Sequence, residues 1–116
     1  MYHSSPAWWP AAGTSLLVRT DGRNQRIPVT DILFLRAEHV YVNLQLVGGK
    51  RLLQRGSLSA LVERLPAQQF LRVHRGYVVN LAAITSWSRE AVFVGEHQLP
   101  ISRARRAEVL SRLEIS

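Results

Sequence analysis

The sequence predicts a mostly β domain built from antiparallel strands, with two short helices. The chain has 116 residues, the length of one domain, and two independent hydrophobic cores are not expected in so short a chain. Hydrophobic residues make up 47% of it, which argues against a disordered chain. They fall mainly into short runs separated by turn-forming residues, the pattern of antiparallel strands, and only two segments have helical spacing.

Roughly eight short strands are expected, each bounded by turn-forming residues. The segments with strand character are residues 15–20, 25–29, 31–36, 40–46, 51–54, 70–73, 84–88, 91–94 and 97–101. Asp21-Gly22 is typical of a two-residue hairpin turn, because both residues tolerate positive φ.

The segment 40–46 alternates apolar and polar residues, which predicts a half-buried strand. Its expected buried face is Val40, Val42, Leu44 and Leu46, and its expected exposed face is Tyr41, Asn43 and Gln45.

Two segments predict helices. In residues 57–65 the apolar side chains recur at the spacing of one helix face, Ser57 is a suitable N-cap and Pro66 ends the helix. The second helix is expected over residues 102–113, with Ser102 as its N-cap. Its expected apolar positions are Ala107, Leu110 and Leu113.

Residues 1–13 are expected to form a flexible tail or interdomain linker, followed by the domain proper over residues 14–116. The tail contains two prolines and a closing glycine, without any periodic pattern. It also contains the adjacent Trp8 and Trp9, which are costly to leave in water. We expect these two side chains to pack on the domain or on a partner.

The charge of the chain favours a polyanionic partner. It has 15 Lys and Arg against 8 Asp and Glu, a net charge of +7, which suits nucleic acid or an anionic membrane surface. All but one of the basic residues, Lys50, are arginines. Arginine can donate two hydrogen bonds to phosphate or to a guanine edge, although the codon usage of a GC-rich genome also explains the ratio.

Several classes of site are not expected. The chain has no cysteine, so it has no disulfides or thiolate metal ligands, and its histidines lack the spacing of a metal site. No phosphate-binding glycine loop or nucleophile elbow occurs, and a trio such as Ser102, His74 and Asp31 can be assembled from any chain of this size. We therefore expect no catalysis, no metal and no cofactor. With no membrane-length apolar run or signal peptide, we expect a cytoplasmic protein without a membrane partner.

The first basic cluster lies in residues 72–75. Alternation places Arg72 and His74 on the outward face of a strand. Arg75 then follows on a loop, where Gly76 permits a turn that a larger residue would resist. A basic side chain on an anchored loop is suited to enter a groove of nucleic acid.

The second basic cluster lies in residues 102–106. Arg103 falls in the first turn of the expected helix, where free N–H groups attract phosphate. The alternative for both clusters is a solvated surface without a partner.

Residues 70–81, Phe-Leu-Arg-Val-His-Arg-Gly-Tyr-Val-Val-Asn-Leu, resemble the core motif of LytTR-type DNA-binding domains: an aromatic residue, Arg-x-His-Arg-Ser and a Val-Asn-hydrophobic close. Three further pieces follow the family order. Residues 31–41 resemble its first strand, acidic loop and tyrosine, residues 57–65 its short helix, and residues 99–103 its closing hydrophobic-x-hydrophobic-Ser-Arg. The resemblance covers about residues 14–114.

The resemblance implies an elongated arrangement of small antiparallel sheets with two short helices, and sequence-specific binding of double-stranded DNA. Loops of the family enter two successive major grooves and the intervening minor groove. His39 and Arg103 then occupy the positions that contact bases in the major grooves, and Arg75 faces the minor groove. Secondary candidates for DNA contact are Arg36, Glu38, Arg55, His74, Asn80, Ser102 and Arg105.

For three residues of the motif, the sequence leaves open whether they contact DNA or support the loop. Asn80 is better suited to hold the loop through its side-chain amide, and His74 either contacts phosphate or supports the loop. Gly76 replaces the usual serine of the family, which removes a hydroxyl that could contact phosphate.

The resemblance also implies partners. The domain is expected to act as the output domain of a bacterial transcription (response) regulator, as a homodimer on repeated half-sites. Its parent protein is expected to carry an N-terminal receiver domain. The chain is then a fragment or a free-standing regulator, and the linker-like residues 1–13 favour a fragment.

Two other functions compete with DNA binding. One is a protein-interaction module anchored by Trp8 and Trp9. The other is binding of RNA or single strands on a β surface, which needs several exposed aromatic residues on strands, whereas Tyr41 is the only clear one.

Overall fold

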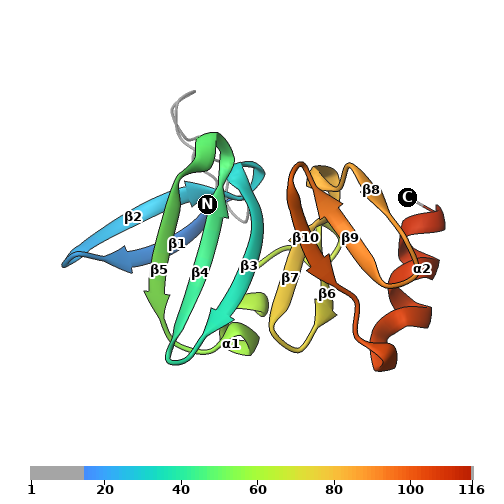
Figure 1. The fold of residues 1–116 in the computed structure, drawn as a ribbon. Helices are drawn as coiled ribbons and strands as arrows, with labels where there is room; N and C mark the ends of the chain where they lie inside the picture. Colours follow the sequence, from blue (N-terminus) through green and yellow to red (C-terminus); the bar gives the residue numbers. More distant parts are fainter. Residues whose placement is uncertain (1–14, 116) are drawn as a thin grey trace, which may run out of the picture.

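The computed structural model describes residues 15–115 (Figure 1). The expected tail, residues 1–13, lies outside the described residues, as do Trp8 and Trp9 within it. The described part forms ten strands and two α-helices. The strands are β1 (Ser15–Thr20), β2 (Arg23–Pro28), β3 (Ile32–Glu38), β4 (Tyr41–Leu46), β5 (Arg51–Arg55), β6 (Phe70–His74), β7 (Tyr77–Asn80), β8 (Ser86–Trp87), β9 (Ala91–Val94) and β10 (His97–Pro100), and the helices are α1 (Leu58–Val62) and α2 (Arg106–Ile115).

The strands form three antiparallel sheets, which confirms the predicted fold class. The largest has the order β5-β4-β3-β7-β6, β1 and β2 form a separate ribbon, and the third sheet has the order β10-β9-β8. The β1–β2 hairpin turns at Asp21 and Gly22 with positive φ values of 53° and 72°, as predicted. The molecule is elongated, with extents of 44 × 32 × 26 Å.

The five-stranded sheet separates two hydrophobic cores, where one core was expected. On one face its side chains pack with α1 and the β1–β2 ribbon, in a core that includes Leu16, Ile27, Leu35, Leu44, Leu58, Leu61 and Val78. On the other face they pack with β9, β10 and α2, in a core that includes Phe34, Leu71, Val73, Val79, Val92, Leu99, Val109 and Leu113. The two cores are not independent, because they share the same sheet.

Strand β7 is the element that the sequence analysis missed. It pairs with both β3 and β6 in the interior of the five-stranded sheet. Val78 belongs to one core and Val79 to the other, and both are fully buried. A strand buried on both faces has consecutive apolar residues and no alternation, which is why residues 77–80 were not predicted to form a strand.

Strand β4 is buried more completely than predicted. Val42 to Leu46 are all buried, including Asn43 and Gln45 at 7% exposure each, so the expected polar face is not exposed. Val40, expected on the buried face, lies in the turn before the strand and is 52% exposed. Alternation predicts which residues share a face, but β4 is an interior strand between β3 and β5, and what covers each face depends on the tertiary fold.

Helix α1 begins as predicted and ends earlier. The Ser57 hydroxyl oxygen accepts a hydrogen bond from the Ala60 N–H over 3.1 Å, which confirms the N-cap. The helix ends at Val62, and tighter turns then carry the chain to Leu65, which is buried in the first core.

Helix α2 begins later than predicted. A 3-10 turn over Arg103–Arg105 precedes it, and the Ser102 side chain makes no capping hydrogen bond, so the expected N-cap is wrong. Val109 and Leu113 are its buried positions, whereas Ala107 is exposed. Neither helix in the described residues is long and apolar enough to cross a membrane.

Candidate nucleic-acid interface

One edge of the five-stranded sheet gathers several of the predicted site residues. Because neighbouring strands are antiparallel, β5, β3 and β6 end at the same edge where β4 and β7 begin. The turn His39–Val40 joins β3 to β4, the turn Arg75–Gly76 joins β6 to β7, and Arg55 ends β5. These segments therefore lie side by side.

The junction between β10 and α2 extends this edge. The Ser102 N–H donates to the Val73 carbonyl oxygen over 2.8 Å, so the following turn, Arg103–Arg105, lies beside the end of β6. Figure 1 shows the β3–β4 turn, the β6–β7 turn and the β10–α2 junction in a row along the lower side of the molecule. We call this surface the loop edge: His39–Val40, Arg55, Arg75–Gly76 and Arg103–Arg105.

The loop edge is basic and accessible. His39, Arg55, Arg75 and Arg103 are exposed, and Arg105 is partly exposed. The structure thus brings together the three main candidates, His39, Arg75 and Arg103, although 64 positions separate the first from the last in the sequence.

His39 lies in the turn with a positive φ, a backbone conformation that few residues other than glycine adopt. Its φ is +58°, and among the described residues only Asp21 is another non-glycine residue with positive φ. Histidine is among the residues enriched in this region, together with asparagine and aspartate. The turn therefore presents His39 to solvent at the tip of a paired hairpin, and the register Glu38–Tyr41 closes the ladder beneath it.

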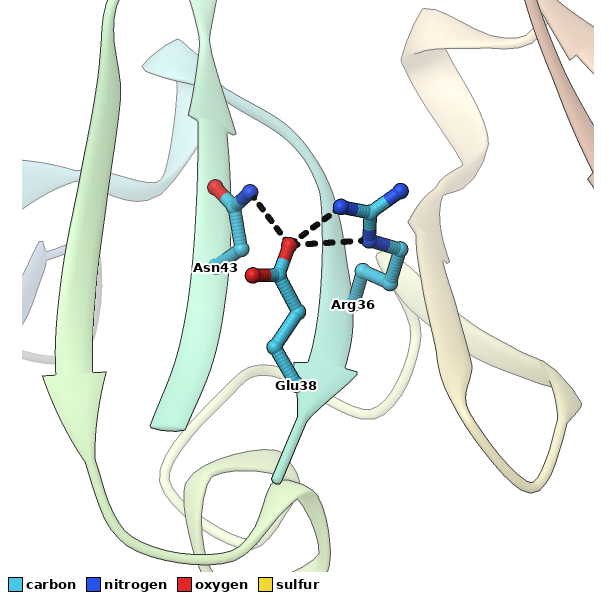
Figure 2. Close-up of polar contacts among 3 residues, drawn as sticks. All are labelled: Arg36, Glu38 and Asn43. Carbon is cyan, nitrogen blue, oxygen red and sulfur yellow. Dashed lines mark hydrogen bonds and ion pairs between the residues drawn. The ribbon is translucent and has the colours of Figure 1, made fainter. Parts of the chain in front are cut away.

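Arg36, Glu38 and Asn43 form a polar cluster behind this turn (Figure 2). The Glu38 carboxylate lies between the other two side chains: Arg36 Nε donates to Glu38 Oε2 over 3.0 Å, and Asn43 Nδ2 donates to the same oxygen over 2.8 Å. Arg36 Nη2 also donates to it. Arg36 and Asn43 are partners across the β3–β4 ladder, which places all three groups on one face.

The cluster shifts the titration of its members. The hydrogen bonds from Asn43 and Arg36 hold the pKa of Glu38 below its ordinary value, and the hydrogen bond to Glu38 raises the pKa of Arg36. The ion pair is partly exposed, so it adds little to stability by itself. It does occupy Arg36, which is thereby less available for DNA than the arginines of the loop edge.

The β6–β7 turn is held by backbone and side-chain bonds. The Gly76 N–H donates to His74 Nδ1 over 3.0 Å, and the Ala37 N–H donates to the Gly76 carbonyl oxygen over 2.9 Å. The His74 ring also packs edge-on against Tyr77, with centroids 5.7 Å apart. His74 therefore supports the turn, one of its two predicted roles.

Gly76 is not required by the backbone of this turn, contrary to the sequence analysis. It is absent from the glycines with positive φ in the described residues. A Cβ built on Gly76 meets only His74 Nδ1, at the ordinary contact distance of 3.6 Å. A serine, as is usual in the resembling family, fits the same conformation.

Two secondary candidates are buried. Asn80 is 5% exposed; its Nδ2 donates to the Ile32 carbonyl oxygen over 2.9 Å and its Oδ1 accepts from the Ala82 N–H over 3.0 Å. It ends β7, at the edge opposite the loop edge. The Ser102 hydroxyl oxygen is also buried, without a partner among the described residues. Both positions therefore suit structural roles better than DNA contact.

Arg55 is the secondary candidate that the structure places best. It is exposed at the end of β5, and its guanidinium lies 6.0 Å from the centre of the Tyr41 ring, its partner across the β4–β5 ladder. Tyr41 is itself 40% exposed. The pair thus adds an ordered cation to the loop edge beside His39.

Comparison with known proteins shows the family of this chain. The sequence pattern of the LytTr DNA-binding domain matches residues 22–114. The chain belongs to the LytTR DNA-binding domain family. This LytTR domain is 36% identical over 86 residues to an uncharacterized response regulatory protein of Vibrio cholerae serotype O1. The alignment covers 67% of the chain and 33% of that relative, so the chain spans about a third of its length.

A solved structure supports the fold of this LytTR domain. It is similar to the LytTr DNA-binding domain of a methyl-accepting/DNA response regulator from Bacillus cereus, with a TM-score of 0.72. The similarity covers 86% of this chain and 96% of that one at 17% sequence identity. The family assignment identifies the chain as a DNA-binding domain, and the loop edge is its candidate interface.

The sequence analysis missed two features of this LytTR domain. One is Asn43, which was expected on an exposed face and instead holds Glu38. The other is the set of hydrogen bonds that Arg72, expected simply to face outward, makes around the β6–β7 turn. The expected strand ended at Arg36 and left Glu38 in the acidic loop, whereas β3 continues to Glu38, so that the i, i+2 pair shares a face. No local signal gives the register that adds Asn43.

Proposed function

We propose that this LytTR domain binds double-stranded DNA sequence-specifically through the loop edge, as the output domain of a bacterial transcription (response) regulator. The observation that carries the proposal is the alignment of three exposed turns, bearing His39, Arg75 and Arg103, along one side of a domain with a net charge of +7. A row of cations on rigid turns matches the phosphate backbone, and the side chains that extend furthest reach base edges.

The length of the domain is compatible with two grooves of a duplex. Successive major grooves on one side of B-DNA lie about 34 Å apart, and the longest extent of the whole domain, including the β1–β2 ribbon and α2, is 44 Å. We assign His39 and Arg103, at the two ends of the row, to the major grooves. Arg75, between them, then faces the minor groove.

Each assignment fits the chemistry of the side chain. The Arg103 guanidinium can donate two hydrogen bonds to guanine O6 and N7. The Arg75 guanidinium suits a narrow minor groove, where the electrostatic potential is most negative. His39 can donate to or accept from a base, depending on its protonation. Arg55 and Arg105 contact phosphates in this arrangement.

The decisive experiment selects bound sequences from a random pool of duplexes and then titrates the selected site with wild-type and Arg103→Ala protein. The variant is expected to lose about 1–3 kcal/mol of binding free energy and to relax preference at one base position. Equal loss on all sequences would show that Arg103 contacts only phosphate. Binding that is weak and insensitive to salt would remove the proposed function altogether.

The proposal includes partners beyond DNA. The Vibrio cholerae relative is a response regulatory protein of which the chain spans about a third, which supports a receiver domain elsewhere in the parent protein. We propose a homodimer on repeated half-sites, with residues 14–116 as the DNA-binding unit and residues 1–13 as its linker. The domain acts by binding in the cytoplasm, without catalysis or a cofactor.

A further inference from the structure

The Arg72 guanidinium joins two parts of the chain that meet behind the loop edge. Its Nη1 donates to the Ser59 hydroxyl oxygen of α1 over 2.9 Å. Its Nε donates to the His74 carbonyl oxygen over 3.4 Å, and its Nη2 donates to the Arg75 carbonyl oxygen. All three nitrogens of the planar guanidinium are thus directed at acceptors: one in α1, one at the last residue of β6 and one in the β6–β7 turn.

We propose that Arg72 is a positioning residue that locks the β6–β7 turn against α1 and so sets where Arg75 meets DNA. The proposal rests on the proposed function for its DNA readout. Arg72 itself is not a DNA contact in this arrangement, because its nitrogens already donate within the domain and its side chain is only partly exposed.

Placing the positive charge of the Arg72 guanidinium at this position costs free energy. Burial, and then the nearby charge of Arg105, lowers the pKa of Arg72. A cation that is partly desolvated beside another cation is favourable only when hydrogen bonds compensate it. The three acceptors around Arg72 supply that compensation, which distinguishes it from the solvated arginines of the loop edge.

The other hydrogen bonds of the β6–β7 turn do not tie it to α1. Ala37 holds Gly76 from β3, and His74 holds Gly76 from within the turn. Neither bond involves Arg75 or α1. Among these contacts, only Arg72 donates a hydrogen bond to the Arg75 carbonyl oxygen. A lysine cannot replace it, because one ammonium on a flexible chain does not span three acceptors as a planar guanidinium does.

The first experiment needs no DNA. Hydrogen exchange is measured by NMR in wild-type, Arg72→Ala and Arg112→Ala protein for the two hydrogen-bonded amides of the turn, Gly76 N–H on His74 Nδ1 and Ala37 N–H on the Gly76 carbonyl oxygen. Arg112 is a matched control, because its Nη2 donates to the carbonyls of Ala67 and Gln68, which precede β6 at the edge opposite the loop edge. Exchange at the turn is expected to accelerate roughly tenfold in Arg72→Ala and to stay unchanged in Arg112→Ala. Unchanged exchange in both would overturn the proposal.

The second experiment is a double-mutant cycle with Arg75→Ala on the selected DNA site. Arg72→Ala is expected to weaken binding roughly 5–10-fold in the wild-type background and hardly at all in the Arg75→Ala background, because it acts through Arg75. Arg72→Ala should leave the salt dependence of binding unchanged. Arg75→Ala should reduce the slope of the logarithm of the binding constant against the logarithm of salt concentration by about one. Additive losses with a reduced slope would show instead that Arg72 contacts phosphate.

Two further variants guard against misfolding. Ser59→Ala removes a single acceptor from α1 and is expected to give a smaller effect in the same direction, and Arg72→Lys is expected to resemble Arg72→Ala. Full rescue by lysine would overturn the proposal. Failure of wild-type protein to bind DNA while the exchange result holds would refute the proposed function but not the lock on the turn.

Discussion

Replacing Asn80 with alanine is expected to destabilise the domain without changing its contacts with DNA. Asn80 is 5% exposed and makes two hydrogen bonds, to the Ile32 carbonyl oxygen and from the Ala82 N–H. The bond to Ile32 is buried, so its loss costs about 1–3 kcal/mol, and loss of the cap on Ala82 costs about 1 kcal/mol more. The expected total of about 2–4 kcal/mol is a large part of the stability of a small domain.

Urea denaturation measures this effect. The midpoint of the Asn80→Ala variant should fall while its m-value stays the same, because the surface exposed on unfolding hardly changes. Under conditions in which the variant is folded, its affinity for the selected duplex should equal that of the wild type. Asn24→Ala is a control at an exposed position of β2 and should change stability by less than about 0.5 kcal/mol. Normal stability with weakened DNA binding would refute the structural role of Asn80.

Two further variants test the polar cluster and the β6–β7 turn. The lowered pKa of Glu38 means that its stabilising contribution is present above the ordinary carboxyl pKa of 4.5 and is lost as pH falls through the folded value. Glu38→Gln should therefore show a smaller loss of unfolding free energy than wild type between about pH 7 and pH 3, and parallel curves would contradict the assignment. Gly76→Ser should leave the unfolding midpoint nearly unchanged, whereas Gly95→Ser, at a φ of +59°, should lower stability by about 1 kcal/mol. Equal losses would show that the turn at Gly76 does need glycine.

Much of the fold could be predicted because its signals are local. The hairpin at Asp21-Gly22 and the cap of α1 at Ser57 each depend on residues within a few positions of one another. The helix expected over residues 102–113 begins four residues later, at Arg106, since a 3-10 turn over Arg103–Arg105 comes first and the Ser102 hydroxyl makes no capping hydrogen bond. The Ser102 N–H bonds Val73 across the fold, a tertiary contact that no local pattern predicts.

The candidate site divides in the same way. Arg75 and Arg103 could be named from basic clusters beside an expected strand and an expected helix, and His39 could be named from the family resemblance alone. The hydrogen bond from Arg72 to Ser59 could not be foreseen, because Ser59 lies 13 positions away and reaches Arg72 only once α1 packs behind the sheet. The partners of Asn43 likewise depend on the β3–β4 register.

The sequence by itself determined the antiparallel β class, the family and the residues that populate the loop edge. Only the tertiary structure decided that β7 is an interior strand and that the three turns lie in one row. The physical reason is that periodicity reports which side chains share a face of one element, whereas burial on both faces of β7 depends on two cores formed by distant segments. Strand order then fixes which turns become neighbours, and strand order is a property of the assembled sheet.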